Sequence, residues 1–337
     1  MGTERRPTPQ QLQRLVEELA EVGLHLDGSE PWHEVAVAEI DYALRPAVHE
    51  RRIPSFGAIV VPTADPTRWG PATGLAISRR PVGDRDAFRA RRYADGVSSW
   101  LIRRGDDGDD EWAVFDRPAG SERDLVVLAA ALGAVMVQRH PAGPVRIVGR
   151  FGVFRWDRMS WHHEPLVADW IDTVTACAPH GDHDVVQMLL EFAVHDLGSR
   201  GIGATLVFRP DDTLVASFDQ RLPRPPPLDI CDPSDLAPLR HVLAQVDGAT
   251  LFDEAGVMRQ IGVRLVPSIE AEADVEGYRG MRHTAARRYS FDDPHATVIV
   301  VSEDGPVTVL RKGELLGAST SSAADGGGDL ALDTDVD

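Results

Sequence analysis

The sequence predicts an α/β (α+β) protein with two domains of mixed helix and strand, followed by a short tail. Amphipathic helical patterns alternate with short apolar runs that are rich in valine and isoleucine. The pattern becomes more regular from about residue 184, and residues 317–337 are mainly Ser, Ala, Gly and Asp. We therefore expect domains over residues 1–180 and 184–316 and a disordered acidic tail over residues 317–337.

The expected N-terminal domain begins with a well-marked helix. Thr8 can cap it, Pro9 suits the first helical position, and Gln11 completes a capping box. We also expect a loop-dominated segment over 68–110, helices over 32–44 and 122–138, and strands over 57–61, 112–115 and 145–148.

No motif in this domain points to a reaction. Trp161-His162-His163-Glu164 and His180-Gly181-Asp182-His183 lack the histidine spacing of a metalloprotease or a structural zinc site. We expect these histidines on the surface or in loops.

The expected C-terminal domain is a mixed sheet surrounded by helices, with some antiparallel hairpins. Helical spacing of apolar residues predicts a helix over 185–197, which the glycines at 198 and 201 end. The other expected helices cover 234–245 and 282–289, and the expected strands cover 202–208, 250–252, 257–265, 297–301 and 307–310.

Composition narrows the classes of function. The net charge of -18 and the pI near 5.0 argue against a general nucleic-acid binder. Cys177 and Cys231 have no partners at metal-ligand spacing and fit a reducing compartment. No apolar run is long enough for a membrane span, and no apolar segment follows the N-terminus. We expect a cytoplasmic protein with no membrane or nucleic-acid partner.

The first candidate motif is Asp247-Gly248-Ala249, between an expected helix and an expected strand. The glycine permits close approach of a backbone or a phosphate, and the carboxylate is suited to a divalent cation. Mg²⁺ usually takes one or two carboxylates plus substrate phosphates, and Glu303, in a turn after a buried strand, is a candidate for the second. Taken alone, Asp-Gly is usually an ordinary turn.

The second candidate motif is Gly280-Met281-Arg282-His283-Thr284. A glycine that enters a helix leaves backbone N–H groups free, and the helix dipole favours an anion there. Arg282 can bind phosphate oxygens through its guanidinium group, and His283 can donate to a phosphate or complete the environment of the metal ion. Taken alone, this motif is more often a helix start with solvated side chains.

The order of these motifs resembles the diadenylate cyclase (DAC) domain, whose signatures are Asp-Gly-Ala and Arg-His-Arg. The flanking segments agree with it: Ile202-Gly203-Ala204, Arg264-Leu265-Val266-Pro267 and Val300-Val301-Ser302-Glu303. The resemblance covers roughly Asp184 to Leu316. It implies a DAC-type mixed sheet and a nucleotidyltransferase that condenses two ATP into cyclic di-AMP and two pyrophosphates.

The resemblance also implies roles for residues. Asp247 would bind Mg²⁺ or Mn²⁺ and help to activate the 3′-hydroxyl, with Glu303 as a second metal carboxylate. Arg282 and His283 would be catalytic residues that handle phosphates. The ATP site would further include Gly248, Ala249, Gly280 and Thr284, with Leu206 and Phe208 at the base pocket. Two protomers would face each other, so self-association is expected.

Two departures from the signatures leave an alternative open. Thr284 stands where the family has the third-position arginine, and Met281 stands where it usually has threonine. Arg287 or Arg288, one turn later, is a candidate replacement for the missing charge. The alternative is a degenerate domain that binds ATP or a cyclic dinucleotide as a sensor, with the first domain as a sensory or regulatory module in either case.

Overall fold

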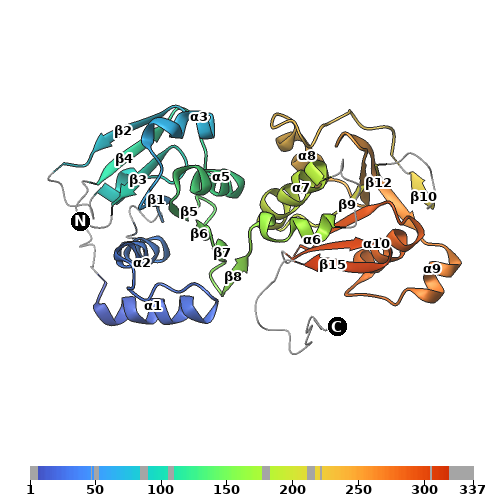
Figure 1. The fold of residues 1–337 in the computed structure, drawn as a ribbon, viewed down its shortest axis with the longest axis horizontal. Coiled ribbons are helices and arrows are strands. Elements are labelled where there is room, and N and C mark those ends of the chain that lie inside the picture. Colours follow the sequence, from blue (N-terminus) through green and yellow to red (C-terminus); the bar gives the residue numbers. More distant parts are fainter. Residues whose placement is uncertain are drawn as a thin grey trace, which may run out of the picture.

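The protein forms two mixed α/β domains that lie side by side (Figure 1). The structure is a computed structural model, and it describes residues 7–46, 48, 53–83, 90–104, 110–176, 183–210, 217–220, 222–303 and 306–318. Within these residues, each domain is built on one mixed sheet. Most of the tail expected over 317–337 lies outside the described residues, but Gly317 and Ala318 belong to the last strand.

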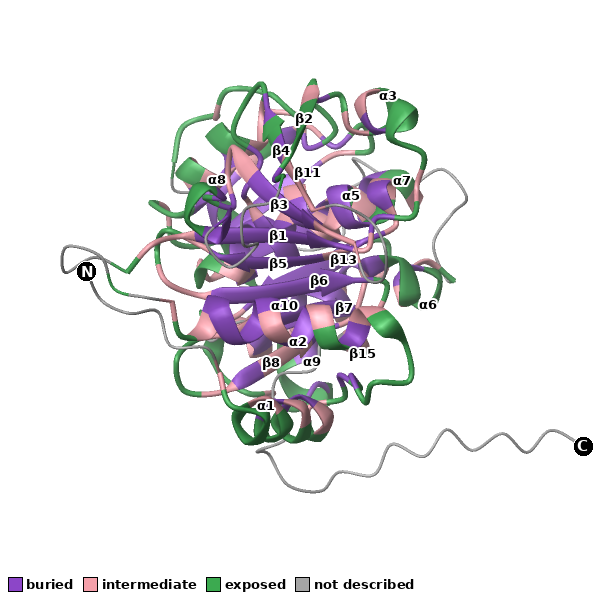
Figure 2. Ribbon diagram, turned by 90° about the vertical axis from the view of Figure 1, so that its left-hand side faces the viewer, coloured by how far each residue is buried: buried purple, intermediate pink, exposed green. Residues whose placement is uncertain are grey.

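The N-terminal sheet has the order β2-β4-β3-β1-β5-β6-β7-β8. Its strands are β1 (Phe56–Val60), β2 (Ile77–Pro81), β3 (Ser99–Arg103), β4 (Glu111–Phe115), β5 (Val135–Arg139), β6 (Val145–Gly149), β7 (Gly152–Trp156) and β8 (Trp161–Glu164). The helices are α1 (Pro9–Glu21), α2 (Pro31–Leu44), α3 (Trp69–Thr73) and α5 (Glu122–Leu132). The short helix α6 (Ile171–Thr175) packs instead in the core of the C-terminal domain, beside α7 (His183–Glu191) and β15 (Glu314–Ala318). The central strands β1, β5 and β6 are the most buried (Figure 2).

The expected first helix is confirmed, because Thr8 and Gln11 form the capping box at the start of α1. Two other expectations were wrong. The helix expected over 122–138 ends at Leu132, since Gly133 adopts a left-handed conformation and a strand follows at once. The described residues of the segment 68–110, which are 68–83, 90–104 and 110, are not mainly loop, because they contain α3, β2 and β3.

The C-terminal sheet has the order β10-β12-β11-β9-β13-β14-β15. Its strands are β9 (Ala204–Phe208), β10 (Ser217–Gln220), β11 (Ala249–Phe252), β12 (Met258–Val266), β13 (Thr297–Val301), β14 (Val307–Arg311) and β15 (Glu314–Ala318). The helices are α7 (His183–Glu191), α8 (Leu236–Leu243), α9 (Ile269–Asp274) and α10 (Met281–Asp292). α7 continues as a π-helical segment, η4 (Phe192–Leu197), and a short 3-10 turn, η5 (Gly198–Arg200).

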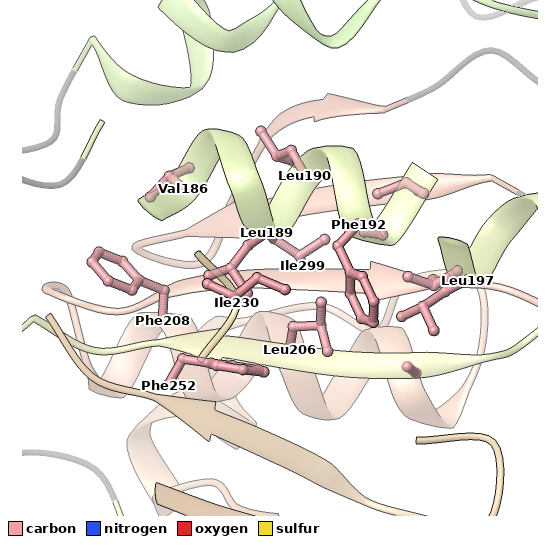
Figure 3. Packing of buried hydrophobic residues seen from close by; sticks show 14 of the residues in the cluster. Val186, Leu189, Leu190, Phe192, Leu197, Leu206, Phe208, Ile230, Phe252 and Ile299 are labelled. Carbon is pink, nitrogen blue, oxygen red and sulfur yellow. The ribbon is translucent and has the colours of Figure 1, made fainter. Parts of the chain in front are cut away.

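The two faces of this sheet are covered by different helices. Leu206 of β9 and Ile299 of β13 pack under α7 and η4, in a core that Figure 3 shows at close range. The alternate residues Val207 and Val298 face Ala286 and the rest of α10. This alternation follows from the two-residue period of a strand, so α7 and α10 lie on opposite faces of one sheet.

The domains contact each other through a buried cluster of charged side chains. Glu122, the first residue of α5, has no exposed side-chain surface and accepts hydrogen bonds from Arg155 of β7 at 2.7 Å and from Nδ1 of His195 in η4 at 2.9 Å. The neighbouring Arg123 contacts Glu191 at 3.3 Å and Asp196 at 3.5 Å. The acidic and basic groups of this interface are therefore paired across the domain boundary.

Among the described residues, no helix combines the length and the apolar character that a membrane crossing requires.

Candidate active site

Three segments with candidate residues converge at one end of the C-terminal sheet. The parallel pair β9–β11 aligns Thr205 with Ala249, and the antiparallel pair β9–β13 aligns Ala204 with Val301. Continuing the two registers places Asp247 on one side of Gly203 and Ser302 on the other. Neighbouring strands are about 4.8 Å apart, so the backbones of Asp247 and of the Ser302–Glu303 turn lie roughly 10 Å apart.

Gly203 is the centre of this arrangement. A Cβ atom on Gly203 would lie 2.4 Å from Nη1 of Arg282 and 2.8 Å from Cγ of Glu303. The same arginine approaches Glu303, with 3.9 Å between Nη2 and Oε1. Gly203 directly precedes β9, and a glycine at such a place often marks the close approach of other groups. The Ile202-Gly203-Ala204 segment supported the family resemblance, but the sequence prediction gave Gly203 no place in the site.

Gly248 holds the Asp247 turn against the neighbouring strand. Its φ is +107°, and a Cβ there would lie 2.8 Å from the carbonyl carbon of Gly262 and 2.9 Å from the carbonyl oxygen of Val263. Only glycine avoids both the strained backbone and this contact. Asp247 itself is exposed, and within the described part of the chain its carboxylate has no hydrogen bond or ion pair.

The carboxylates of Asp247 and Glu303 are suited to Mg²⁺ or Mn²⁺. Both groups are exposed, on either side of Gly203, and the side chain of Glu303 is 74% accessible. The residues that the structure describes hold no cluster of three or more His, Cys, Asp or Glu side chains that would form a metal cage. Two carboxylates completed by substrate phosphates are the ordinary coordination of Mg²⁺ with a nucleotide, so the donor set fits this ion.

The N-terminus of α10 supplies the positive side of the site. Gly280 caps the helix without a side-chain hydrogen bond, so the first N–H groups of the helix have no side-chain acceptor. His283 is only 7% exposed, and its Nε2 atom has no hydrogen-bond partner in the described residues. Burial, followed by the charges of Arg279 and Arg282, lowers the pKa of His283. The imidazole is therefore neutral at pH 7 and able to donate one hydrogen bond.

Thr284 does not face the same space as Arg282. Its hydroxyl accepts a hydrogen bond from the backbone N–H of Tyr278 at 3.1 Å and donates to the carbonyl of that residue at 3.3 Å. Thr284 therefore has no free hydroxyl group for the predicted direct contact with ATP. Thr284 acts on the site through the segment that it holds in place.

The predicted base-pocket residues lie elsewhere. Leu206 is 0% exposed and Phe208 is 1% exposed, and both pack in the core beneath α7 (Figure 3). This burial argues against contact with a bound base, because no surface of either side chain is open. Ala249 is also buried, at 2% exposed, on the α10 side of the sheet, so only its backbone lies at the site end of β11.

Arg287 and Arg288 hold backbone carbonyl groups instead of facing the site. The guanidinium of Arg287 donates to Gly313 at 2.7 Å and to Glu276 at 3.2 Å. That of Arg288 donates to Val275 at 3.2 Å and to Glu272 at 3.4 Å. These bonds argue against the hypothesis that one of them replaces the family's third arginine, which the turnover of Arg287→Ala and Arg288→Ala would test.

In the part of the chain that the structure describes, the histidine-rich stretches form no metal-binding cluster. Trp161–Glu164 is strand β8 and not a loop, and the ring of His163 stacks on Phe154 with 4.3 Å between centroids. In the other stretch, residues 180–182 lie outside the described residues, and His183 begins α7.

Comparison with known families finds a match for each of the two domains. Residues 191–315 match the family model described as DisA bacterial checkpoint controller nucleotide-binding, the DAC model. The C-terminal domain belongs to the DAC family. Residues 13–164 match a second model, described as probable sensor domain DACNK. The chain therefore joins a DACNK domain to a DAC domain that follows it.

Comparison with individual proteins adds little. The chain matches no curated protein. A solved structure titled a hypothetical membrane spanning protein from Bacillus cereus is 20% identical, over 40% of this chain and 70% of that chain, with a TM-score of 0.31. A score this low supports no structural or functional conclusion.

Proposed function

We propose that the DAC domain condenses two ATP molecules into cyclic di-AMP and two pyrophosphates, with a divalent metal, between two facing protomers. The observation that carries the proposal is the convergence of an exposed carboxylate pair and an arginine on Gly203. Phosphoryl transfer depends mainly on positioning and on neutralising charge, and this end of the sheet holds the groups for both.

Each residue has a distinct task in the proposed reaction. The 3′-oxygen of one ATP attacks the α-phosphorus of the other, the bond from that phosphorus to the pyrophosphate breaks, and the 3′-hydroxyl loses its proton. In this reaction the carboxylate of Asp247 assists the proton loss, while Arg282 and the N–H groups of α10 bind the phosphate oxygens. A second attack with the roles exchanged closes the ring. Mg²⁺ or Mn²⁺ held by Asp247 and Glu303 would neutralise charge on the phosphates.

The second candidate function is a nucleotide sensor without turnover. It is favoured by Thr284, whose hydroxyl is engaged with Tyr278 and supplies no charge. It is also favoured by Met281, which is 93% exposed at the helix start where the family usually has threonine. The retained pair of carboxylates favours activity.

The N-terminal domain is proposed to regulate the reaction through the charged interface. His195, which binds Glu122 of the first domain, is separated from Gly203 only by residues 196–202. This short connection runs from η4 through η5 to Gly203 and β9, so a shift of α5 would be transmitted to Gly203 at the start of β9. A connection of this kind is a physical route for coupling, which activity measurements on interface variants test.

Product analysis separates the two functions. Purified protein is incubated with ATP and either Mg²⁺ or Mn²⁺, and the products are identified by mass spectrometry. The proposal predicts cyclic di-AMP and pyrophosphate, while ATP binding without product in either metal supports the sensor. Absence of both product and nucleotide binding would contradict both functions.

Protein concentration tests the facing arrangement. If a site needs two protomers, the rate in the dilute range rises with the square of the protein concentration. A strictly linear dependence in a protein shown to be monomeric would contradict it.

A further inference from the structure

The loop before α10 places a second arginine beside the candidate site. Arg279 has a φ of +50°, an uncommon conformation for a residue other than glycine. Its guanidinium carbon lies 5.4 Å from the centroid of the Tyr278 ring. That ring makes an edge contact with the His283 ring, with 5.9 Å between centroids. The aromatic ring of Tyr278 thus lies in contact with both Arg279 and His283.

Thr284 keeps this loop in place. Its hydroxyl bonds to both backbone groups of Tyr278, and the N–H of Gly280 donates to the carbonyl of the same residue at 2.6 Å. These contacts hold Arg279 in its unusual backbone conformation, next to the start of the helix. The residue at the family's third signature position therefore contributes no charge itself but fixes a loop that carries one.

The surroundings of Arg279 differ from those of the other arginines of this region. Arg287 and Arg288 are held by backbone carbonyl groups. Arg279 is exposed, and in the described residues the Tyr278 ring is the one contact of its guanidinium group. The group also helps to lower the pKa of His283, which is consistent with its position close to that imidazole.

We propose that Arg279 binds the phosphate chain of a nucleoside triphosphate and replaces the charge that the third-position arginine supplies in the family. The inference rests on the proposed nucleotide site. Arg279 and Arg282 lie before and within the first turn of α10, near His283 and the free N–H groups of the helix. A triphosphate bound at this helix start would meet both guanidinium groups, so the site would keep two positive charges with Thr284 in the signature.

The test compares ATP with adenosine, because adenosine lacks the phosphates. Arg279→Ala is expected to weaken ATP binding roughly tenfold, the effect of one charge-assisted hydrogen bond, and to leave adenosine binding unchanged. Arg279→Lys should keep part of the affinity. Arg259→Ala is the matched control, since it removes an equal charge from β12 near the opposite end of the sheet, and it should change neither affinity.

A second variant separates a direct role from a structural one. Thr284→Val removes the hydroxyl that holds Tyr278, and it should lower ATP affinity in the same direction as Arg279→Ala. The double variant should be no weaker than Arg279→Ala alone, because both changes act on the same contact. An ATP affinity that changes less than twofold in Arg279→Ala overturns the inference, as does an equal loss for adenosine. A wild-type protein that binds no nucleotide would instead overturn the proposed function.

Discussion

The domain interface and the candidate active site are both clusters of charged residues, yet their chemistry is opposite. At the interface, the carboxylate of Glu122 has no exposed surface and is bonded to Arg155 and His195. At the site, Asp247 is exposed and without a protein partner among the described residues, and Glu303 is 74% exposed with its nearest guanidinium nitrogen 3.9 Å away. The charged groups of the interface are paired within the protein, whereas the carboxylates of the candidate site remain accessible to a ligand.

This difference indicates what each cluster contributes. Buried charges are stable only when they are paired and hydrogen-bonded, so the interface charges hold two domains in one orientation. Exposed carboxylates that lie beside an arginine and a helix N-terminus add little to folding and remain available for a metal ion and phosphates. The comparison predicts that interface variants change stability and that site variants change chemistry without changing stability.

The largest expected effect on folding is at Glu122. Glu122→Gln leaves Arg146 without its carboxylate and Arg155 with only the longer carboxylate contact, to Glu164 at 3.4 Å, and it should reduce the free energy of unfolding by about 3–5 kcal/mol. Chemical denaturation measures this loss. Glu111→Gln, which removes partly exposed ion pairs with Arg79 and Arg104, is the control and should cost about 1 kcal/mol or less. Equal losses of unfolding free energy in the two variants would contradict the proposed difference between the buried interface charges and exposed ones.

The same carboxylate predicts how stability depends on pH. Burial alone would raise the pKa of Glu122, but Arg155 and His195 offset it and hold the pKa well below the ordinary 4.5. A group with a lowered pKa stabilises the fold above its ordinary pKa, and this contribution is lost as the pH falls below that value. The unfolding midpoint of the wild type should therefore fall more steeply below pH 4.5 than that of Glu122→Gln.

A smaller effect, confined to chemistry, is expected at Gly203. The added Cβ of Gly203→Ala would displace the flexible ends of Arg282 and Glu303 instead of backbone atoms, so the fold should tolerate it. A displacement of about 1 Å at a reacting centre costs roughly 100-fold in rate. We expect the rate of cyclic di-AMP formation to fall by about this factor while the melting temperature is retained. A normal rate would show that these side chains need no such proximity to Gly203.

The smallest expected effect is a gain in ATP affinity when Met281 is replaced by threonine. This side chain is 93% exposed at the first position of α10, where the related domains usually have threonine. Met281→Thr adds a hydroxyl beside the free N–H groups, and one such hydrogen bond is worth about 1 kcal/mol, or roughly fivefold in ATP affinity. Titration with ATP measures the change. Met281→Ala is the control, since it removes the thioether without adding a donor.

Many residues of the candidate site could be predicted from the sequence, because each motif consists of adjacent residues. Asp247-Gly248-Ala249 and the glycine before Arg282 each combine a conformational requirement with a charged group in adjacent positions. The structure brings Arg282 and Glu303 together at Gly203, at the strand ends where the register also places Asp247. The pairing register of the strands between the motifs determines that these residues meet. No single sequence motif carries this information.

The errors have physical causes too. The apolar run after Glu122 continues through a helix, a turn and a strand, so hydrophobicity alone did not reveal that Gly133 ends the helix. The interface was missed because Glu122 and His195 are far apart in the chain and belong to no motif. Leu206 and Phe208 were assigned to the wrong surroundings, since strand alternation does not reveal which face carries α7 and which carries α10.

The most direct test of the account is the rate of cyclic di-AMP formation by Asp247→Asn beside the wild type. The substitution keeps the size of the side chain and removes its charge at an exposed position, so the melting temperature should not change. We expect the rate with either metal to fall at least about 100-fold, because the metal ligand and the group that assists proton loss are removed together. A variant that forms cyclic di-AMP at the wild-type rate would contradict the assignment of the site.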